Sequence, residues 1–190
     1  MRIVAAFVLL WLMAAPAASQ SDAAQDAAWA ALARDGAVAL VRHAAAPGGA
    51  GDPDGFRLDD CATQRNLSAR GRDQARALGV LFRERRIATG RVVASQWCRC
   101  RETATLMDLG PVADAPTFNN AYVLRRQADA LTAGARQTIA GWRGPGALVV
   151  VTHGQNIRLL TGVDPGEGGV VVVRPDGEGF AVVGRIAPPT

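Results

Sequence analysis

The chain has 190 residues, of which 49% are hydrophobic and 20% are charged, and its formal net charge is +4. This length and composition are typical of a soluble globular protein with a buried core and exclude a disordered or fibrous chain. All 21 basic residues are Arg, and they are scattered without a basic block or interleaved aromatic residues, which argues against a nucleic-acid-binding surface.

The N-terminal segment has the order of a secretory signal peptide. A short positive start at Met1-Arg2 precedes an apolar run over residues 3–15, and small residues follow up to Ser19. The apolar run is shorter than the roughly 20 residues that span a membrane. We therefore expect residues 1–19 to be a cleaved signal peptide, with an uncleaved anchor as the alternative. Residues 20–190 are then expected to form one mature domain in a bacterial periplasm, without stable membrane insertion.

The first half of the mature chain alternates helical and strand patterns. Residues 22–34 are Ala-rich and helical in pattern, and an apolar run over residues 37–41 predicts a buried strand. The Gly, Pro and Asp content of residues 47–55 predicts a loop. Ser68 is expected to cap a helix that continues to about Arg86.

The second half continues the alternation and ends in a hairpin. Its predicted elements are strands over residues 92–95 and 147–152, helices over 99–109 and 128–142, a helix opening at 156–160, and hairpin strands over 170–174 and 180–185. Strands that alternate with helices predict a three-layer α/β/α sandwich with a mostly parallel central sheet.

The predicted export affects the expected state of the three cysteines. An oxidising compartment permits a disulfide, and an odd number leaves one thiol over. We expect Cys61 to pair with either Cys98 or Cys100, because Cys98 and Cys100 are too close in sequence to pair with each other.

Both histidines of the chain follow predicted strands. His43 ends the run "ALVRH" and His153 ends "VVVTH", and Ser95 also lies at a strand end. Ligands of such sheets bind beyond the carboxyl ends of the strands. We therefore expect these three side chains to converge on one crevice.

The sequence lacks the patterns that are typical of several common kinds of active site. Two His without metal-ligand spacing do not predict a zinc site, and we expect neither a metal nor another cofactor. No Gly-x-Ser-x-Gly elbow, no glycine-rich nucleotide loop, and no Arg six residues after a Cys occurs.

Phosphoryl transfer through a histidine nucleophile fits the pattern better. Imidazole forms covalent intermediates, and a phosphoryl group needs several fixed cations or donors around its oxygens. The candidate catalytic residues are Arg42, His43, Arg99 and His153, and the candidate substrate-binding residues are Arg42, Arg99, Gly154 and Gln155. The last two offer backbone N–H groups at the start of a helix.

Four segments in order resemble the histidine phosphatase superfamily, which has the phosphoglycerate-mutase-like fold. They are "LVRHA", "LSARGRDQARALG", "SQWCRCRETA" and "VVVTHGQN". The resemblance implies that His43 becomes phosphorylated, that Arg42 and Arg99 bind the phosphate, and that His153 contacts the transferring group. "GDPDGFRLDDCATQRNLS" further resembles periplasmic phosphatases of lipopolysaccharide core heptose phosphate, without fixing the substrate.

The chain departs from this family at the general acid, the group that protonates the leaving oxygen. Asn119 and Asn120 stand where one branch of the family has a carboxylate, and Gly154 stands where another has Asp. The loop after His43 holds four aspartates that either reach the site or form a solvated acidic loop; they are Asp52, Asp54, Asp59 and Asp60.

Together these patterns predict an exported phosphatase that acts on a phosphorylated small molecule or glycan through a phosphohistidine. One alternative is an envelope protein that binds a phosphorylated glycan with little or no turnover. A second alternative is a phosphohistidine phosphatase, because such substrates have good leaving groups. Residues 48–66 and 118–126 are expected to form the pocket rim.

Overall fold

The computed structural model describes residues 17–49 and 51–190. The apolar run on which the signal-peptide prediction depends therefore lies outside the described residues. The first described element, helix α1 (Ala17–Leu32), begins five residues before the helix that the sequence predicts.

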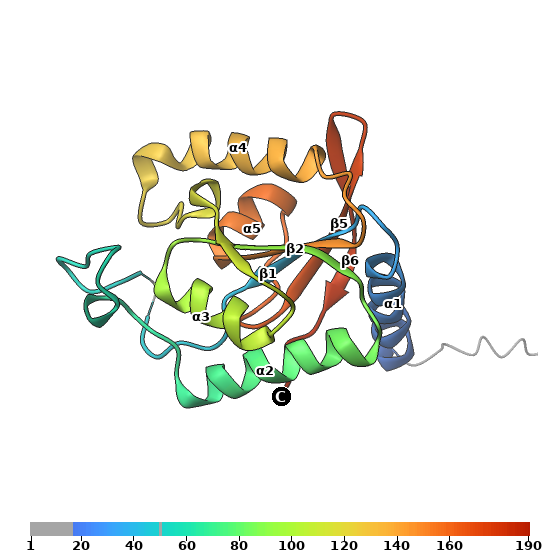
Figure 1. Cartoon of the computed structure of the whole chain (residues 1–190), viewed down its shortest axis with the longest axis horizontal. Helices are drawn as coiled ribbons and strands as arrows, with labels where there is room; N and C mark the ends of the chain where they lie inside the picture. Colours follow the sequence, from blue (N-terminus) through green and yellow to red (C-terminus); the bar gives the residue numbers. More distant parts are fainter. Residues whose placement is uncertain (1–16, 50) are drawn as a thin grey trace, which may run out of the picture.

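A six-stranded sheet in the order β3-β2-β4-β1-β5-β6 forms the centre of the fold (Figure 1). Its strands are β1 (Val38–Arg42), β2 (Thr89–Ala94), β3 (Val112–Asp114), β4 (Ala147–Thr152), β5 (Val170–Asp176) and β6 (Gly179–Ile186). Strands β1 to β4 are parallel to one another, whereas β5 is antiparallel to β1 and β6 is antiparallel to β5. The predicted mostly parallel sheet is confirmed.

Helices cover both faces of the sheet. Helices α1, α2 (Ala69–Glu84) and α3 (Cys98–Met107) pack on one face, and α4 (Ala128–Ala140) and α5 (Gly154–Thr161) pack on the other (Figure 1). Short 3-10 helices occupy Cys61–Thr63, Pro116–Phe118 and Arg125–Gln127. The structure is thus the three-layer α/β/α sandwich expected from the sequence.

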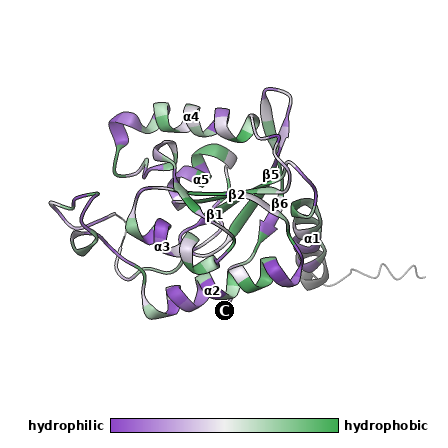
Figure 2. Cartoon of the chain, in the orientation of Figure 1, coloured by the Kyte–Doolittle hydropathy of each residue, from purple (hydrophilic) through white to green (hydrophobic). Residues whose placement is uncertain are grey.

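The strand β1 shows why a continuous apolar run lies at the centre. Ala39 and Val41 face the core under α1, α2 and α3, whereas Val38 and Leu40 face the core under α4 and α5. Successive residues of a strand point to opposite faces, so a strand covered on both faces must be apolar at every position. In Figure 2 the strands are coloured mainly as hydrophobic, while the helices carry hydrophilic stretches.

Several other element boundaries also differ from the prediction. Strand β2 begins at Thr89, three residues earlier than expected, and the three-residue strand β3 was not predicted because it is too short to show periodicity. The hairpin turn is also shorter than "PDGEG". Pro175 belongs to β5 and lies beyond the residues paired with β1, where its missing N–H costs no hydrogen bond to that neighbour.

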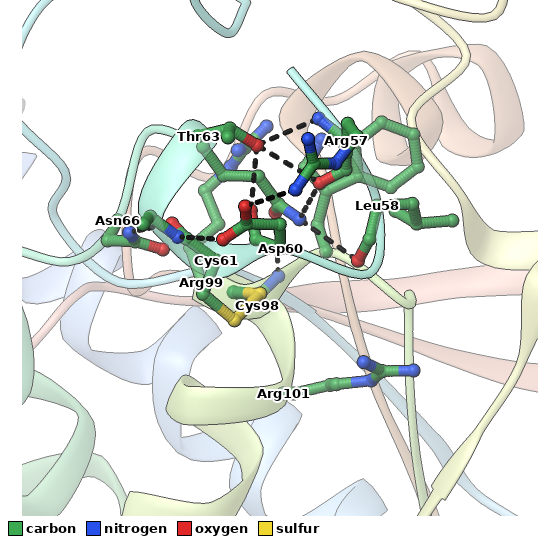
Figure 3. Close-up of a disulfide and its surroundings, with 12 residues drawn as sticks. Arg57, Leu58, Asp60, Cys61, Thr63, Asn66, Cys98, Arg99 and Arg101 are labelled. Carbon is green, nitrogen blue, oxygen red and sulfur yellow. Dashed lines mark hydrogen bonds and ion pairs between the residues drawn. A yellow bond between two sulfur atoms is a disulfide. The ribbon is translucent and has the colours of Figure 1, made fainter.

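A disulfide joins the loop after β1 to helix α3. Cys61 and Cys98 are bonded, with their Cα atoms 5.7 Å apart, and Cys100 is a buried free thiol (Figure 3). Helix geometry decides between the two predicted partners, because side chains two residues apart do not share a face. Cys98 faces the loop, whereas the Cys100 sulfur contacts the Thr152 carbonyl oxygen at the end of β4.

Candidate active site

The two histidines lie side by side at the carboxyl edge of the sheet. Arg42, the last residue of β1, is paired with Thr152, the last residue of β4, so the next residue of each strand is a histidine. The His43 N–H donates to the Thr152 carbonyl at 2.9 Å. The two imidazole centres are 5.5 Å apart, and each residue is only 3% exposed.

An open pocket of about 530 Å³ lies above this edge. It brings together all six residues that the sequence nominated: Arg42, His43, Arg99, His153, Gly154 and Gln155. Parts of both predicted rim segments also line it, namely Gly48, Gly49, Gly51, Arg65, Asn120 and Tyr122. Ser95, directly after β2, reaches the same site through a hydrogen bond with His153.

The imidazole of His43 is held in one orientation. Its Nδ1 lies 2.9 Å from the Ala44 carbonyl oxygen, which only accepts, so Nδ1 carries the proton and donates. Burial, reinforced by the positive charges of Arg99, Arg65 and Arg42, lowers the pKa of His43 to about 3. The ring is therefore neutral at pH 7, and its Nε2 retains a lone pair, which is the state that a nucleophile requires.

His153 is anchored through its Nε2 atom, whereas His43 is anchored through Nδ1. Its Nε2 lies 2.9 Å from the Ser95 hydroxyl oxygen, and its Nδ1 faces an Arg99 N–H group at 3.5 Å. Because a guanidinium only donates, Nδ1 is the acceptor and Nε2–H donates to Ser95. Burial, followed by the charge of Arg99, holds the pKa of His153 well below its usual range, so this ring is also neutral at pH 7.

The buried Arg99 supplies a fixed cation beside both histidines. Its two terminal nitrogens bind Asp52 at 2.6 and 3.2 Å, and one of them also donates to the Arg65 carbonyl at 3.2 Å. The Nε–H of Arg99 is buried and has no hydrogen-bond partner among the described residues. Since buried donors are normally paired, this group indicates an acceptor on a ligand.

Arg42 has the same feature: a buried Nε–H without a partner in the described part of the chain. It forms an ion pair with Asp164 at 3.1 Å and lies 3.7 Å from Glu167. A Cβ added at Gly154 would come within 3.2 Å of the Arg42 side chain. Gly154 thus permits the close approach of this guanidinium to the start of α5.

Four charged pocket residues were missed by sequence reasoning. They are Arg65, Arg158, Asp164 and Glu167. Arg65 lies inside the predicted rim and was not singled out, whereas the other three come from α5 and the loop that follows it. The run "DPGEGG" signals a turn, but no local pattern indicates that this turn folds back over β1.

The aspartates of the loop after His43 do not supply a general acid. The side chain of Asp52 is buried, and although burial alone would raise its pKa, hydrogen bonds and charge from Arg99 lower the pKa overall, so the carboxylate stays ionised. Asp59 and Asp60 pair with Arg57, and Asp54 is exposed. None of the four lines the pocket described above. The expectation that these aspartates reach the pocket is therefore wrong. The alternative, that they form a solvated acidic loop, is wrong for Asp52, because its side chain is buried against Arg99.

The two asparagines that stand where the sequence resemblance leads us to expect a carboxylate have structural partners. Asn119 receives the Gln96 N–H at 2.9 Å and lies 3.3 Å from the Ser95 hydroxyl. Asn120 lines the pocket, and its side chain accepts the Tyr122 N–H at 3.0 Å. Asn120 is thus part of the pocket wall, Asn119 supports Ser95 and Gln96 behind it, and neither offers a proton-donating carboxyl group.

Within residues 17–49 and 51–190, no cluster of three or more His, Cys, Asp or Glu side chains is arranged to hold a metal ion. Over the same ranges, no helix combines the length and apolar character that crossing a bilayer requires.

Comparison with known families yields one match. The model of the histidine phosphatase superfamily (branch 1) matches residues 38–116, a range that contains His43 and Arg99 and stops before His153. No curated protein matches the chain significantly.

Solved structures with the same fold include several phosphatases. The putative phosphohistidine phosphatase SixA from Agrobacterium tumefaciens is 19% identical, with a TM-score of 0.52, and the alignment covers 82% of this chain and 99% of that one. A protein from Mycobacterium tuberculosis is 16% identical with a TM-score of 0.57, covering 78% and 96% of the two chains. A mycobacterial glucosyl-3-phosphoglycerate phosphatase is 16% identical with a TM-score of 0.55, covering 77% and 96%.

At these identities, the structural likeness establishes the fold. The superfamily match covers the part of the chain that carries His43 and the two candidate site arginines, Arg42 and Arg99. Together with the phosphatases among the structural neighbours, it supports a phosphatase enzyme.

Proposed function

We propose that this phosphatase is exported and hydrolyses a phosphomonoester, of which an envelope sugar phosphate is one candidate, by transferring the phosphoryl group to His43. The observation that carries the proposal is the arrangement around that residue. A neutral imidazole, fixed through Nδ1, shares its pocket with two arginines, Arg42 and Arg99, whose buried Nε–H groups have no hydrogen-bond partner among the described residues.

The charge of the pocket suits a phosphoryl group. Arg42, Arg65 and Arg99 lower the pKa of His43 through their positive charges, which means that they act on the same small volume. During its transfer a phosphoryl group spreads negative charge over three oxygens. Guanidinium groups that are already fixed in place stabilise that charge without having to move. The N–H groups at the start of α5, at Gly154 and Gln155, add donors at the positive end of a helix.

Two proteins with this fold have been solved in complex with oxyanions that resemble phosphate. One neighbour is a protein histidine phosphatase SixA complexed with tungstate, and another is the glucosyl-3-phosphoglycerate phosphatase complexed with VO3. Tungstate and vanadate imitate phosphate in charge and shape. Because one neighbour is named as a protein histidine phosphatase and the other as a sugar-phosphate phosphatase, both substrate classes should be tested.

Export and a periplasmic location rest on two observations of different kinds. The first 19 residues have the order of a signal peptide. The Cys61–Cys98 disulfide fits a protein that folds in an oxidising compartment, because cytosolic reductants keep most thiols reduced. Fractionation of the host cell, with and without residues 1–19, tests this part of the proposal.

A covalent trap tests the catalytic part. The mature protein is mixed with p-nitrophenyl phosphate, quenched under alkaline conditions that preserve phosphohistidine, and mapped by mass spectrometry. We expect phosphate on His43, and none in a folded His43→Ala variant. A folded wild-type protein that binds phosphate but neither forms the adduct nor releases nitrophenol would refute the enzyme and favour the binding protein.

A substrate panel then separates the candidate classes. Heptose and hexose phosphates represent the envelope sugars, and a phosphohistidine peptide represents the phosphoramidates. Preferential turnover of the peptide would overturn the proposed phosphomonoester substrate while leaving the His43 mechanism in place.

A further inference from the structure

The phosphoryl-transfer mechanism leaves the proton for the departing oxygen unassigned. When the ester is that of an ordinary alcohol, the alcohol is a poor leaving group as an alkoxide. A positioned acid that protonates the leaving oxygen accelerates such a step by about 10²- to 10⁴-fold. The aspartates of the loop after His43 do not line the pocket, and Glu102 is paired with Arg72. Two carboxylates do line the pocket, namely Asp164 and Glu167.

Asp164 is committed to structural contacts. It binds Arg42 at 3.1 Å, receives the Gly166 N–H at 3.1 Å, and pairs with Arg158. The hydrogen bond from Gly166, together with the charges of Arg158 and Arg42, lowers the pKa of Asp164. Its carboxylate is thereby kept ionised and acts only as an acceptor.

Glu167 is held much more loosely at the mouth of the same pocket. Its carboxylate lies 3.7 Å from Arg42 and 3.8 Å from Arg65, accepts no hydrogen bond from the described residues, and the side chain is 30% exposed. It therefore occupies the space between two guanidiniums that a phosphate dianion would also bind. A dianion bound to both arginines would therefore lie beside the Glu167 carboxyl group.

The backbone that carries Glu167 is fastened to the strand that carries His43. The Gly168 N–H donates to the carbonyls of Arg42 and His43 at 3.2 and 3.1 Å, and the Arg42 N–H donates to the Gly169 carbonyl at 3.0 Å. Gly168 has φ of +75°, and a Cβ there would lie 2.4 Å from the Gln74 side chain. Only glycine fits this close approach, so the loop places Glu167 at a defined position relative to the nucleophile.

We propose that Glu167 is the general acid and base of the reaction, an inference that rests on the proposed function. In the first step, the His43 Nε2 lone pair attacks phosphorus, the bond from phosphorus to the ester oxygen breaks, and that oxygen takes the Glu167 carboxyl proton. In the second step, the Glu167 carboxylate removes a proton from water as the water oxygen attacks phosphorus. The phosphorus–nitrogen bond then breaks, inorganic phosphate departs, and Nε2 regains its lone pair while Glu167 is again protonated.

The test compares leaving groups in Glu167→Gln. Nitrophenolate leaves without a proton, so phosphorylation of His43 by p-nitrophenyl phosphate should fall by less than about tenfold, whereas kcat for an alkyl phosphate should fall by about 10²- to 10⁴-fold. KM should stay level or decrease, because a negative charge near the phosphate is removed. Glu167→Asp should recover part of the alkyl phosphate activity.

Glu178→Gln is the matched control. Glu178 lies exposed in the turn between β5 and β6, so the same change of charge there should alter neither substrate's rate. Equal losses on both substrates in Glu167→Gln would assign Glu167 a positioning role and overturn the inference, as would equal rates in wild type and variant. If the wild-type protein forms no phospho-His43 with the nitrophenyl ester, the proposed function itself fails, and this is seen before any Glu167 variant is measured.

Discussion

Asp52 and Arg99 form a two-pronged ion pair that is sealed from solvent. The side chains are 0% and 1% exposed, and the shortest distance between the carboxylate and the guanidinium is 2.6 Å. Asp52 also accepts the Trp97 indole N–H at 2.8 Å and the Arg65 backbone N–H at 3.0 Å. One carboxylate from the loop after β1 thus orients the arginine that lies beside both histidines.

Removing this carboxylate is expected to destabilise the fold. Asp52→Asn leaves the buried guanidinium of Arg99 without its counter-charge, a change that typically costs about 3–5 kcal/mol. Urea denaturation at pH 7 measures the difference. Asp59→Asn is the control, because the Asp59 side chain is 88% exposed, and its effect should stay within about 0.5 kcal/mol. Equal stabilities of Asp52→Asn and wild type would contradict this account of the pair.

The disulfide is expected to contribute substantially to stability. Cys61 and Cys98 are 37 residues apart in sequence, and a crosslink of such a loop typically stabilises a protein by about 2–5 kcal/mol. The denaturation midpoint should therefore decrease when a reductant is added. The Cys100→Ala variant retains the disulfide and should show the same shift, whereas Cys61→Ser should be insensitive to the reductant.

Cys100 is expected to be chemically inert in the native protein. Burial raises the pKa of the Cys100 thiol to about 12, so almost no thiolate, the reactive form, exists at pH 8. A thiol-specific reagent without reductant should label no cysteine in the folded chain and one after denaturation. Rapid labelling of the folded protein would show that the thiol is accessible.

The buried histidines predict a loss of stability at mildly acidic pH. The pKa of His43 is about 3 in the folded state and near 6.5 in an unfolded chain, so the unfolded state binds more protons between these values. Stability should then decrease as the pH falls below about 6.5, by up to about 1.4 kcal/mol per pH unit for this one group. Comparison between pH 6.5 and 4 also avoids most of the titration of Asp52, Asp114 and Asp164, whose lowered pKa values act at lower pH.

Denaturation of His43→Asn at pH 7, 6, 5 and 4 measures this effect. The slope of stability against pH should become shallower, and a remainder should persist because the pKa of His153 is lowered in the same way. An unchanged slope in His43→Asn would indicate that His43 titrates normally in the folded protein.

Two glycines of helix α2 allow the effect of overpacking on stability to be distinguished from an effect on the geometry of the active site. A Cβ at Gly71 would lie 2.0 Å from the Ala45 carbonyl oxygen, and a Cβ at Gly79 would lie 1.9 Å from the Met107 carbonyl oxygen. Both Gly→Ala changes should destabilise the fold, by about 1–3 kcal/mol for overpacking. Gly71→Ala should also slow the phosphorylation of His43, because Ala45 adjoins the residue that orients the His43 ring. Equal rates per folded molecule in the two variants would contradict that link.

The mostly parallel character of the sheet and the positions of both histidines at strand ends were accessible from local patterns. The apolar runs that precede His43 and His153 predicted two buried strands, and parallel neighbours end at the same edge. The role of Glu167 was not accessible in this way. Its segment carries only turn signals, and its place over β1 depends on backbone hydrogen bonds between residues more than 120 positions apart.

The sequence by itself therefore determined the layers of the fold and the edge at which the histidines and Arg99 meet, since these depend on periodicity and strand direction. The tertiary structure alone decided that Asp52 is buried against Arg99, that Cys98 rather than Cys100 pairs with Cys61, and that Glu167 faces the pocket. The physical reason is that irregular loops carry no repeating pattern. Their conformation follows from long-range hydrogen bonds and ion pairs that exist only once the chain has folded.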